Sequence, residues 1–562
     1  MITSFSKSGN DAFQSGFRGG RVTGRSSWRL REVPPELVER YRAEGWWTDE
    51  TLGSIAATGL AELADLRFAA HSAARPWDGT FAELDRQARA LAQALHDRGI
   101  GPDDVVVFQM PNWMEAGVAF FAAAFLGATI VPIVHFYGPK EVGYILDQVR
   151  PAVIVTPDRF GATEHLAMYD TLLADRPDPI WLVVGDTPAD ALPARAEPFA
   201  ALLDGPGLAA PLAADPDAPA VLGFTSGTTS NPKGVIHSHR TIVFESKQLG
   251  GRMPQSTQGQ ITGAPVGHFI GMLNAFLTPL LFPRPVHLVD VWDPGAVLAL
   301  MLREKLTMGG GATFFLTSLL DHPDFCDAHL ALMPTAGLGG SAVPLAVTQR
   351  ATDLGITVFR AYGSTEHPSI TGCSVDDPLD KRLATDGQVL EGVEMRLDEL
   401  GEISSRGPDL SMGYTDPELT ASVFDADGWY RTGDVGVVDQ DGYLAITDRV
   451  SDVIIRGGEN ISAQEVEELL LQMSGVAEVA VVAAPDARLG EHAAAIVRVL
   501  PGGAAPGLDD VRTHLAAAGL AKQKWPEEVH AVAELPRTAS GKVQKFVLRQ
   551  HLRDGTLETT FS

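Results

Sequence analysis

Cysteine is scarce in this chain of 562 residues, where only Cys326 and Cys373 occur. Two thiols so far apart in the sequence supply neither a disulfide framework nor a cysteine-based zinc cluster. Such a low cysteine content suits a reducing cytosol. We therefore predict a cytoplasmic protein that does not depend on disulfide bonds.

Long hydrophobic runs are also missing. The longest apolar stretch, Val118–Val134, is shorter than the roughly 20 residues that span a bilayer, and Gly127 and Pro132 interrupt it. Its pattern favours a buried helix followed by a buried strand. The N-terminal residues are rich in serine, glycine and basic side chains but lack the apolar core of a secretory signal. We expect residues 1–35 to form a disordered leader.

Basic side chains are outnumbered, because 44 Lys and Arg residues stand against 71 Asp and Glu residues, for a net charge of −27. No basic run suggests a nucleic-acid partner, and phosphate ligands would have to be held by local groups. The content of 45% hydrophobic and 20% charged residues is that of an ordinary globular protein. Since single cores rarely grow beyond about 250–300 residues, we expect two or more domains.

Helix and strand patterns alternate along the first few hundred residues. A helix is predicted to start at a capping box of Thr80 and Glu83 and to end at Gly99, and the strand 105–110 follows it. This alternation favours a largely parallel sheet covered by helices. The segment 204–219 is rich in Pro, Gly and Ala, which predicts a surface connection.

The pattern changes after Arg449. Helices are predicted at 463–473 and 508–519, and strands at 476–483, 493–500 and 529–535. These elements make a small unit of about one hundred residues, which is within the normal size of a domain. The predicted fold class is therefore α/β, with a large N-terminal domain of mostly parallel sheets covered by helices and a small α+β C-terminal domain.

One short stretch, FTSGTTSNPKGV (Phe224–Val235), combines two glycines, five hydroxyl side chains and Lys233. We expect it to form a loop after the strand 220–225, with a helix starting at about His237. Glycines let the backbone approach a ligand, and the hydroxyls and the cation can hold a polyphosphate. A Ser/Thr-rich surface turn is the alternative. The order Pro-Lys-Gly differs from the Gly-Lys-Ser/Thr ending of a P-loop, which argues against a P-loop hydrolase or kinase.

The core of this stretch, TSGTTSNPKG, resembles the phosphate loop of the adenylate-forming enzymes, which include acyl-CoA synthetases, adenylation enzymes and luciferases. Further motifs of that family follow in the same order: GGSAVP (339–344), YGSTE (362–366), YRTGD (430–434), DRVSDVIIRGGENIS (448–462) and PRTASGK (536–542). The resemblance implies a domain of residues 36–449 and a mobile C-terminal domain of residues 450–562. It also implies that a carboxylate is joined to AMP, with ATP, Mg²⁺ and coenzyme A as the expected cofactors and co-substrates.

The resemblance assigns a nucleotide site residue by residue. Glu366 is implied as the Mg²⁺ ligand, Thr365 as the contact to the α-phosphate, and Asp434 as the acceptor for the ribose hydroxyls. The other implied nucleotide-binding residues are Thr225, Ser226, Gly227, Thr228, Thr229 and Lys233 at the phosphates, Gly339, Gly340, Ser341, Tyr362 and Gly363 beside the adenine, and Arg449 at the ribose or phosphate. Ser230 stands where the family commonly has glycine.

The same resemblance places an acyl pocket beside His268, which is also a candidate catalytic residue, with Phe269, Met272 and Gly339 in its wall. Phe269 stands where enzymes for catechol-type acids carry asparagine, which argues against a hydroxybenzoate. A buried core histidine is the alternative for His268. His237 and His239 lack further ligands for a metal, so we interpret them as local structure at the start of a helix.

The C-terminal motifs imply a moving domain. Lys542 matches the catalytic lysine of the family, which neutralises charge in the adenylation step. Gly457, Gly458 and Glu459 match the loop that lines the thiol tunnel after the domain rotates. The implied hinge is Ser451, where the family usually has Asp or Lys.

The segments 41–52 and 522–545 resemble those of free-standing ligases for medium-chain, alicyclic or aryl acids. The leading hypothesis is therefore an acyl-CoA ligase for a hydrophobic carboxylic acid. An adenylation enzyme that loads a carrier protein differs only in the thiol and remains the alternative, as does an enzyme that uses another nucleophile. A non-catalytic binding protein would be expected to have lost Lys542 or Glu366, and both are present.

Overall fold

The structure is a computed structural model. It describes residues 28–176, 179–225, 231–253, 258–308, 310–340, 343–456, 459–486, 488–500, 502–537 and 543–558. Within these ranges no helix combines the length and the apolar character that crossing a bilayer requires.

A seven-stranded sheet forms the first half of the molecule, with the strand order β7-β6-β5-β3-β4-β8-β9. Its strands are β3 (Val105–Gln109), β4 (Thr129–Ile133), β5 (Val153–Pro157), β6 (Ile180–Val184), β7 (Ala196–Pro198), β8 (Pro219–Thr225) and β9 (Lys233–Ser238). The neighbouring helices are α2 (Leu52–Glu62), α3 (Phe81–His96), α4 (Met114–Phe125), α5 (Pro139–Val149), α6 (His165–Leu173) and α7 (His239–Arg252), with short 3₁₀ turns η1 (Ala189–Ala191) and η2 (Phe199–Leu202). All pairs except β8 with β9 are parallel.

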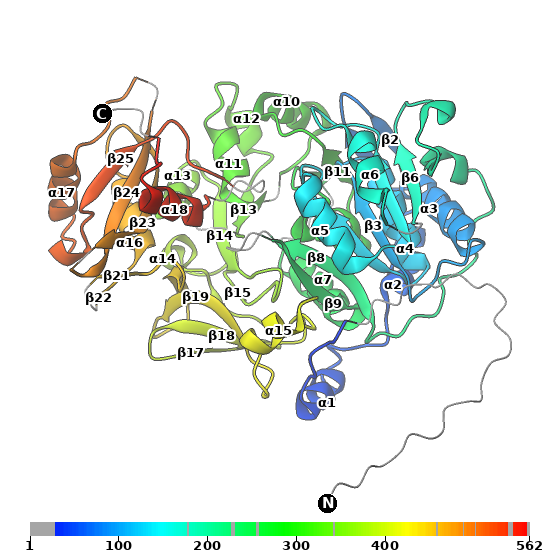
Figure 1. The fold of residues 1–562 in the computed structure, drawn as a ribbon, viewed down its shortest axis with the longest axis horizontal. Coiled ribbons are helices and arrows are strands. Elements are labelled where there is room, and N and C mark those ends of the chain that lie inside the picture. The colour runs from blue at the N-terminus through cyan, green and yellow to red at the C-terminus, as the bar shows by residue number, and fades with distance from the viewer. Residues whose placement is uncertain are drawn as a thin grey trace, which may run out of the picture.

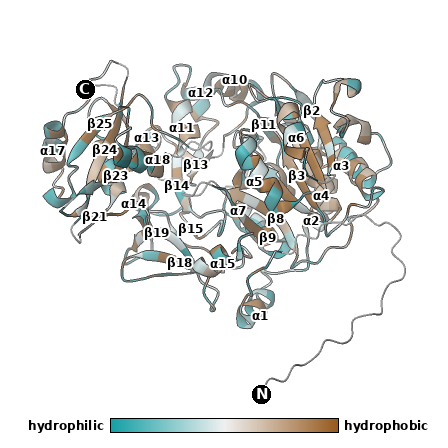
Figure 2. Ribbon diagram, viewed as in Figure 1, coloured by the Kyte–Doolittle hydropathy of each residue, from teal (hydrophilic) through white to brown (hydrophobic). Residues whose placement is uncertain are grey.

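Both faces of this sheet are covered, as the unbroken apolar runs of its strands predict. Along β3, Val106 and Phe108 pack into one hydrophobic cluster with α3 and α4, whereas Val105 and Val107 pack into a second cluster with α5. The strands are correspondingly brown in Figure 2. The stretch Val118–Val134 forms most of α4 and all of β4, which confirms the buried helix and buried strand expected there.

The capping box predicted for α3 is present. The Thr80 hydroxyl accepts a hydrogen bond from the Glu83 backbone N–H at 3.3 Å, and the Glu83 carboxylate accepts one from the Thr80 N–H at 2.8 Å. These bonds satisfy backbone donors that would otherwise be unpaired in the first turn. The helix therefore starts where the sequence predicts.

Two further sheets, each with both parallel and antiparallel pairs, follow with their helices. The four-stranded sheet has the order β10-β11-β1-β2, with β1 (Arg67–His71), β2 (Trp77–Thr80), β10 (Gln260–Thr262) and β11 (Val286–Val289). The five-stranded sheet has the order β12-β13-β14-β15-β16, with β12 (Gly310–Gly311), β13 (Thr335–Leu338), β14 (Thr357–Tyr362), β15 (Thr371–Gly372) and β16 (Gln388–Val389). The helices of this part are α8 (Phe269–Met272), the π-helical turn η3 (Leu273–Leu277), α9 (Thr278–Leu281), α10 (Pro294–Glu304), α11 (Thr313–Leu320), α12 (Asp327–Leu330), α13 (Leu345–Asp353) and α14 (Leu379–Ala384).

An antiparallel sheet follows, with β17 (Glu394–Leu397), β18 (Glu402–Arg406), β19 (Tyr430–Val438) and β20 (Leu444–Arg449), and with α15 (Pro417–Val423) beside it. The C-terminal unit contains β21 (Ile454–Arg456), β22 (Glu459–Ile461), β23 (Val476–Asp486), β24 (Gly490–Val499), β25 (Glu528–Ala531), α16 (Ala463–Leu470), α17 (Leu508–Ala517), the 3₁₀ turn η4 (Lys522–Lys524) and α18 (Lys545–Asp554). It has a core of its own and lies at the left of Figure 1, beyond β19. The predicted fold class is confirmed.

One element differs from the sequence-based expectation. The helix expected from about His237 starts at His239, and β9 (Lys233–Ser238) precedes it. Val235 and Ile236 are β-branched and buried, and they extend the sheet by pairing antiparallel with β8. The glycine and hydroxyl stretch therefore connects two strands of a hairpin, and Ser238 caps the helix that follows.

The N-terminal segment is packed from Trp28 onward, so the expected leader can concern only residues 1–27, which lie outside the described residues. Trp28, Leu30 and Val33 contact the second cluster of the large sheet, and α1 (Pro35–Ala43) follows directly. Arg31 donates from Nε to the carbonyl oxygen of Ser411 at 2.6 Å and from its backbone N–H to that of Met412 at 2.9 Å. Burial lowers the pKa of this guanidinium to about 10, so the side chain is charged at neutral pH.

We expect Arg31→Ala to lower the free energy of unfolding by about 1.5–3 kcal/mol, because the carbonyl groups of a partly buried loop lose a charged donor. Thermal unfolding of the variant measures this loss. The matched control is Arg29→Ala, since the Arg29 side chain is exposed. Equal melting temperatures for the two variants would show that Arg31 does not stabilise the loop.

Candidate nucleotide and acyl-transfer site

The ends of β8 and β9 lie against the segment that carries Thr365. The imidazole Nε2 of His237 lies 2.7 Å from the Thr365 carbonyl oxygen, and its ring packs against Phe269 with the centroids 4.9 Å apart. Burial lowers the pKa of His237 to about 4, so the ring is neutral and donates its Nε2–H to that carbonyl. Gly223 leaves the room for this packing, because a Cβ there would lie 2.9 Å from the Thr365 methyl group.

His237 thus does more than the local role that the sequence suggested, since it joins segments 128 residues apart. His239 Nδ1 accepts a hydrogen bond from the Leu52 N–H at 3.1 Å. Among the described residues, no group of His, Cys, Asp and Glu could hold a metal ion by clustering. Both imidazoles have protein partners.

Asp434 holds two of the other predicted residues. The Tyr362 hydroxyl donates to its Oδ2 at 2.7 Å, and Arg449 Nε lies 2.9 Å from its Oδ1. The pairing of β19 with β20 sets Asp434 opposite Arg449, and the end of β14 supplies Tyr362. Asp434 is only 5% exposed. Burial and the Asp434 charge raise the pKa of Tyr362 well above its ordinary value, so the phenol remains a donor.

Glu366 lies four residues after Tyr362, in the same YGSTE segment. Its Oε1 accepts a hydrogen bond from the hydroxyl of Tyr414 at 2.7 Å, whereas its Oε2 makes no hydrogen bond to a described residue. The side chain is 9% exposed. Burial and the Glu366 charge raise the pKa of Tyr414, which keeps this hydroxyl protonated. A carboxylate with one oxygen anchored and the other available fits Mg²⁺, which takes few protein ligands and completes its shell with phosphate oxygens and water.

Glycines shape the turns around these side chains. A Cβ at Gly363 would lie 1.9 Å from the carbonyl oxygen of Pro368, and one at Gly339 would lie 2.8 Å from that of Ala361. Gly340 has φ +75°, a conformation that favours glycine. The backbone can therefore follow paths here that a larger residue would block.

The residues predicted for the acyl pocket lie at the start of α8. His268 is the N-cap residue of that helix, and its backbone N–H donates to the Pro265 carbonyl. Phe269 and Met272 are buried in the main hydrophobic cluster. Gly267 touches the end of β4, because a Cβ there would lie 2.2 Å from the Ile133 carbonyl oxygen. The acyl pocket itself stays a prediction.

Several predicted residues lie outside the described residues. They are Ser226, Gly227, Thr228 and Thr229 of the phosphate loop, its variant position Ser230, Ser341, Gly457, Gly458 and Lys542. The structure describes the residues on either side of these segments. Thr225 pairs with Lys233 at the open end of the β8–β9 hairpin, and Arg537 forms a bridge with Val543 on either side of the Lys542 segment. Glu459 is the first residue of β22.

The predicted hinge, Ser451, lies in the turn between β20 and β21. The Asp452 carboxylate next to it accepts a hydrogen bond from Arg549 of α18 at 2.7 Å. Asp448 at the end of β20 accepts one from the Ala463 N–H at the start of α16. The turn is thus the place where the antiparallel sheet passes into the C-terminal unit.

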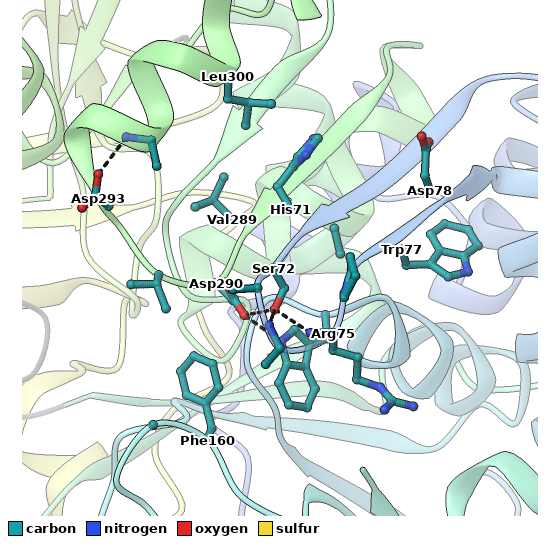
Figure 3. A pocket seen from close by; sticks show the side chains of 18 of the residues that line it. His71, Ser72, Arg75, Trp77, Asp78, Phe160, Val289, Asp290, Asp293 and Leu300 are labelled. Carbon is teal, nitrogen blue, oxygen red and sulfur yellow. Dashed lines mark hydrogen bonds between the residues drawn. The ribbon is translucent and has the colours of Figure 1, made fainter. Parts of the chain in front are cut away.

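A groove of about 1280 Å³ lies elsewhere, at the carboxyl ends of β1, β11, β3, β5 and β6 (Figure 3). No residue predicted for the nucleotide or acyl site lines it. At its centre Asp290 accepts hydrogen bonds from the Ser72 hydroxyl at 2.5 Å and from Trp113 Nε1 at 2.8 Å. These polar groups satisfy one another, and the groove shares no lining residue with the candidate site.

Comparison with known proteins agrees with the motif order. The family model described as "AMP-binding enzyme" matches residues 69–415, and the model of the "AMP-binding enzyme C-terminal domain" matches residues 465–542. A medium-chain fatty-acid–CoA ligase of Escherichia coli (strain K12) is 33% identical over 91% of this chain and 92% of its own length. A ligase of Rhodococcus jostii (strain RHA1), "3-[(3aS,4S,7aS)-7a-methyl-1,5-dioxo-octahydro-1H-inden-4-yl]propanoyl:CoA ligase", is 36% identical over 84% of this chain and 93% of its own.

Among solved structures, ATP-bound MatB from Rhodopseudomonas palustris superposes with a TM-score of 0.78 at 28% identity, covering 90% of this chain and all of its own. The similarity extends over both the large N-terminal part and the small C-terminal unit. The chain therefore belongs to the AMP-binding enzyme family.

Proposed function

We propose that this enzyme activates a hydrophobic carboxylic acid as its acyl-AMP, with release of pyrophosphate, and then transfers the acyl group to coenzyme A. The reaction class, ATP-dependent acid–CoA ligation through an acyl-adenylate, is that of the family and of the named relatives. The acid, the metal and the individual residue roles are the parts that remain proposals. The cytoplasmic location stays a prediction from composition.

The observation that carries the site assignment is the convergence of Tyr362 and Arg449 on Asp434, with Glu366 four residues after Tyr362 in the sequence. Asp434 would accept hydrogen bonds from the ribose hydroxyls, which a carboxylate does well. Tyr362 and Arg449 hold that carboxylate in place from two sides. Glu366 would bind Mg²⁺, which would supply positive charge to the phosphate oxygens. Lys233 and the loop before it would hold the β- and γ-phosphates, and Thr365 the α-phosphate.

The chemistry then needs positioning more than covalent help. A carboxylate oxygen is a weak nucleophile, so the site must hold it in line with the α-phosphate and the departing pyrophosphate. Lys542 would place its charge beside the reacting oxygens during this step. The thiol of coenzyme A would afterwards enter through a tunnel lined by residues 457–459 and attack the acyl carbon, breaking the bond to the phosphate oxygen and releasing AMP. Rotation at Ser451 would exchange the two arrangements.

A hydrophobic acid is supported by two observations. The residues predicted for the pocket wall include the buried apolar side chains of Phe269 and Met272, and two curated relatives are named as CoA ligases for medium-chain fatty acids and for an indene-derived propanoic acid. A carrier-protein pantetheine is the alternative acceptor, because its thiol arm is the same as that of coenzyme A.

The test is a screen of pyrophosphate release over straight-chain, alicyclic and aryl acids, with and without coenzyme A. We expect the best acids to be apolar and the acyl-CoA product to accumulate only when coenzyme A is present. A preference for small polar acids would refute the substrate class. Acyl-AMP that is never passed to coenzyme A would refute the acceptor and favour a carrier protein.

A separate prediction concerns the hinge. Ser451→Pro should fix φ near −65° and hinder rotation, so that adenylation and thioester formation respond unequally. The substitution removes no hydrogen bond from the Ser451 N–H to another described residue. Rates of the two half-reactions, measured separately, check this, with Ser451→Ala as the control. Equal loss in both half-reactions would move the hinge to another position.

A further inference from the structure

Tyr414 contacts Glu366 from a segment that contains no residue predicted for the site. The Tyr414 side chain is 3% exposed, and its hydroxyl donates to Oε1 of Glu366 at 2.7 Å although the two residues are 48 positions apart. A phenol is a neutral donor, so it fixes the orientation of a carboxylate without cancelling its charge. A hydrogen bond to one oxygen leaves the other oxygen free to bind a cation.

The backbone around Tyr414 is held firmly. The Met412 N–H donates to the Ile236 carbonyl at 2.7 Å, and the Thr415 N–H donates to the Gly234 carbonyl at 2.8 Å, so this segment pairs with β9. The Tyr414 N–H donates to the Thr420 hydroxyl at 2.9 Å. The phenol therefore has little freedom to move away from Glu366.

Residues 405–411 also hold the backbone of Glu366 and the side chain of the residue after it. The Ser411 N–H donates to the carbonyl oxygen of Glu366 at 2.8 Å. The next residue, His367, is fully buried and lies with Nε2 3.2 Å from Asp409 and with Nδ1 2.7 Å from the Ser405 hydroxyl. Residues 405–414 thus bind the backbone of Glu366, the side chain of its neighbour His367 and the Glu366 carboxylate.

We propose that Tyr414 is a positioning residue that orients the Glu366 carboxylate so that Oε2 faces the metal of a bound Mg·ATP. The inference rests on the proposed function, because it requires Glu366 to bind the metal. Tyr414 itself does not touch the nucleotide or the acid. Its effect is to present one carboxylate oxygen in a single orientation, which lowers the cost of metal binding.

The test is Tyr414→Phe, which removes the hydroxyl group and keeps the buried aromatic ring. Binding of Mn²⁺, used as a paramagnetic substitute for Mg²⁺, is measured by electron paramagnetic resonance in the presence of ATP and in the absence of acid. We expect the dissociation constant for Mn²⁺ to rise about tenfold, the size expected when one hydrogen bond to a charged group is lost. The half-saturating Mg²⁺ concentration of the reaction should rise in parallel, and kcat at saturating Mg²⁺ should stay within about twofold.

Tyr169→Phe is the matched control, since the Tyr169 hydroxyl makes a buried hydrogen bond of 2.9 Å to Gln109 far from Glu366 in sequence. It should leave Mn²⁺ binding unchanged. An unchanged Mn²⁺ affinity in Tyr414→Phe would overturn the inference. So would a Tyr414→Phe protein that fails to fold, because the hydroxyl would then serve the fold and not the metal site.

Glu366→Gln separates this inference from the proposed function. If Glu366→Gln leaves Mn²⁺ affinity unchanged, the proposed metal role of Glu366 is wrong, and the inference fails with it. If Glu366→Gln weakens Mn²⁺ binding and Tyr414→Phe does not, only the inference fails. In the double variant the effect of Tyr414→Phe should vanish, because the carboxylate that it orients is gone.

Discussion

Lys542→Ala is expected to slow formation of the acyl-adenylate by a factor of about 10² or more, the scale of losing one group that stabilises charge in a transition state. The same variant, supplied with synthetic acyl-AMP and coenzyme A, should form the thioester at a near-normal rate. Lysine suits this role because it is a compact charge on a flexible stem that can enter and leave the site. The two half-reactions are measured separately, by release of pyrophosphate and by loss of free thiol.

Gly458→Leu is the complementary variant, because a bulky side chain should crowd the thiol tunnel and spare the nucleotide site. It should slow thioester formation and leave adenylation near normal. If Lys542→Ala slows both half-reactions equally, the lysine is structural or the two domain arrangements do not alternate. The two variants together therefore test the separation of the steps.

Asp434→Asn should weaken binding of ATP by about 10- to 100-fold, which corresponds to a loss of about 1.5–3 kcal/mol. The substitution keeps the shape of the side chain and removes the charge that pairs with Arg449 at 2.9 Å. It also replaces one acceptor oxygen, so that either Tyr362 or a ribose hydroxyl loses its partner. Isothermal titration calorimetry with Mg·ATP measures the dissociation constant.

Asp439→Asn is the control, since Asp439 follows β19 and pairs with Lys381 on a more exposed side of the sheet. It should bind ATP as the unmodified enzyme does. A folded Asp434→Asn protein with unchanged affinity for ATP would remove Asp434 from the nucleotide site.

Local signals in the sequence predict the regular elements well. The Thr80 and Glu83 pair gives the start of α3, and the run Val118–Val134 gives α4 and β4, because capping and burial are properties of neighbouring residues. The sequence does not predict the strand β9. Val235 and Ile236 follow a stretch rich in hydroxyl side chains, and they form a strand because they pair with β8, which the local sequence does not reveal. The antiparallel sheet β17–β20 has no equally clear local pattern.

The candidate site likewise contains residues that the sequence indicates and contacts that only the fold shows. Motif order indicates Asp434, Glu366 and Arg449, and the structure places Asp434 and Arg449 in contact. The contacts of His237 with Thr365 and of Tyr414 with Glu366 could not be predicted, because each joins side chains from segments that meet only in the folded chain. The sequence likewise does not predict that residues 28–33 are packed. Three apolar side chains there reach the core, but the polar and basic residues around them resemble a disordered segment.

The most direct test of the central claim is to quantify every product of one reaction that contains the enzyme, ATP, Mg²⁺, coenzyme A and an accepted acid. We predict AMP, pyrophosphate and acyl-CoA in equal amounts. Formation of ADP and inorganic phosphate in place of AMP and pyrophosphate would contradict this prediction.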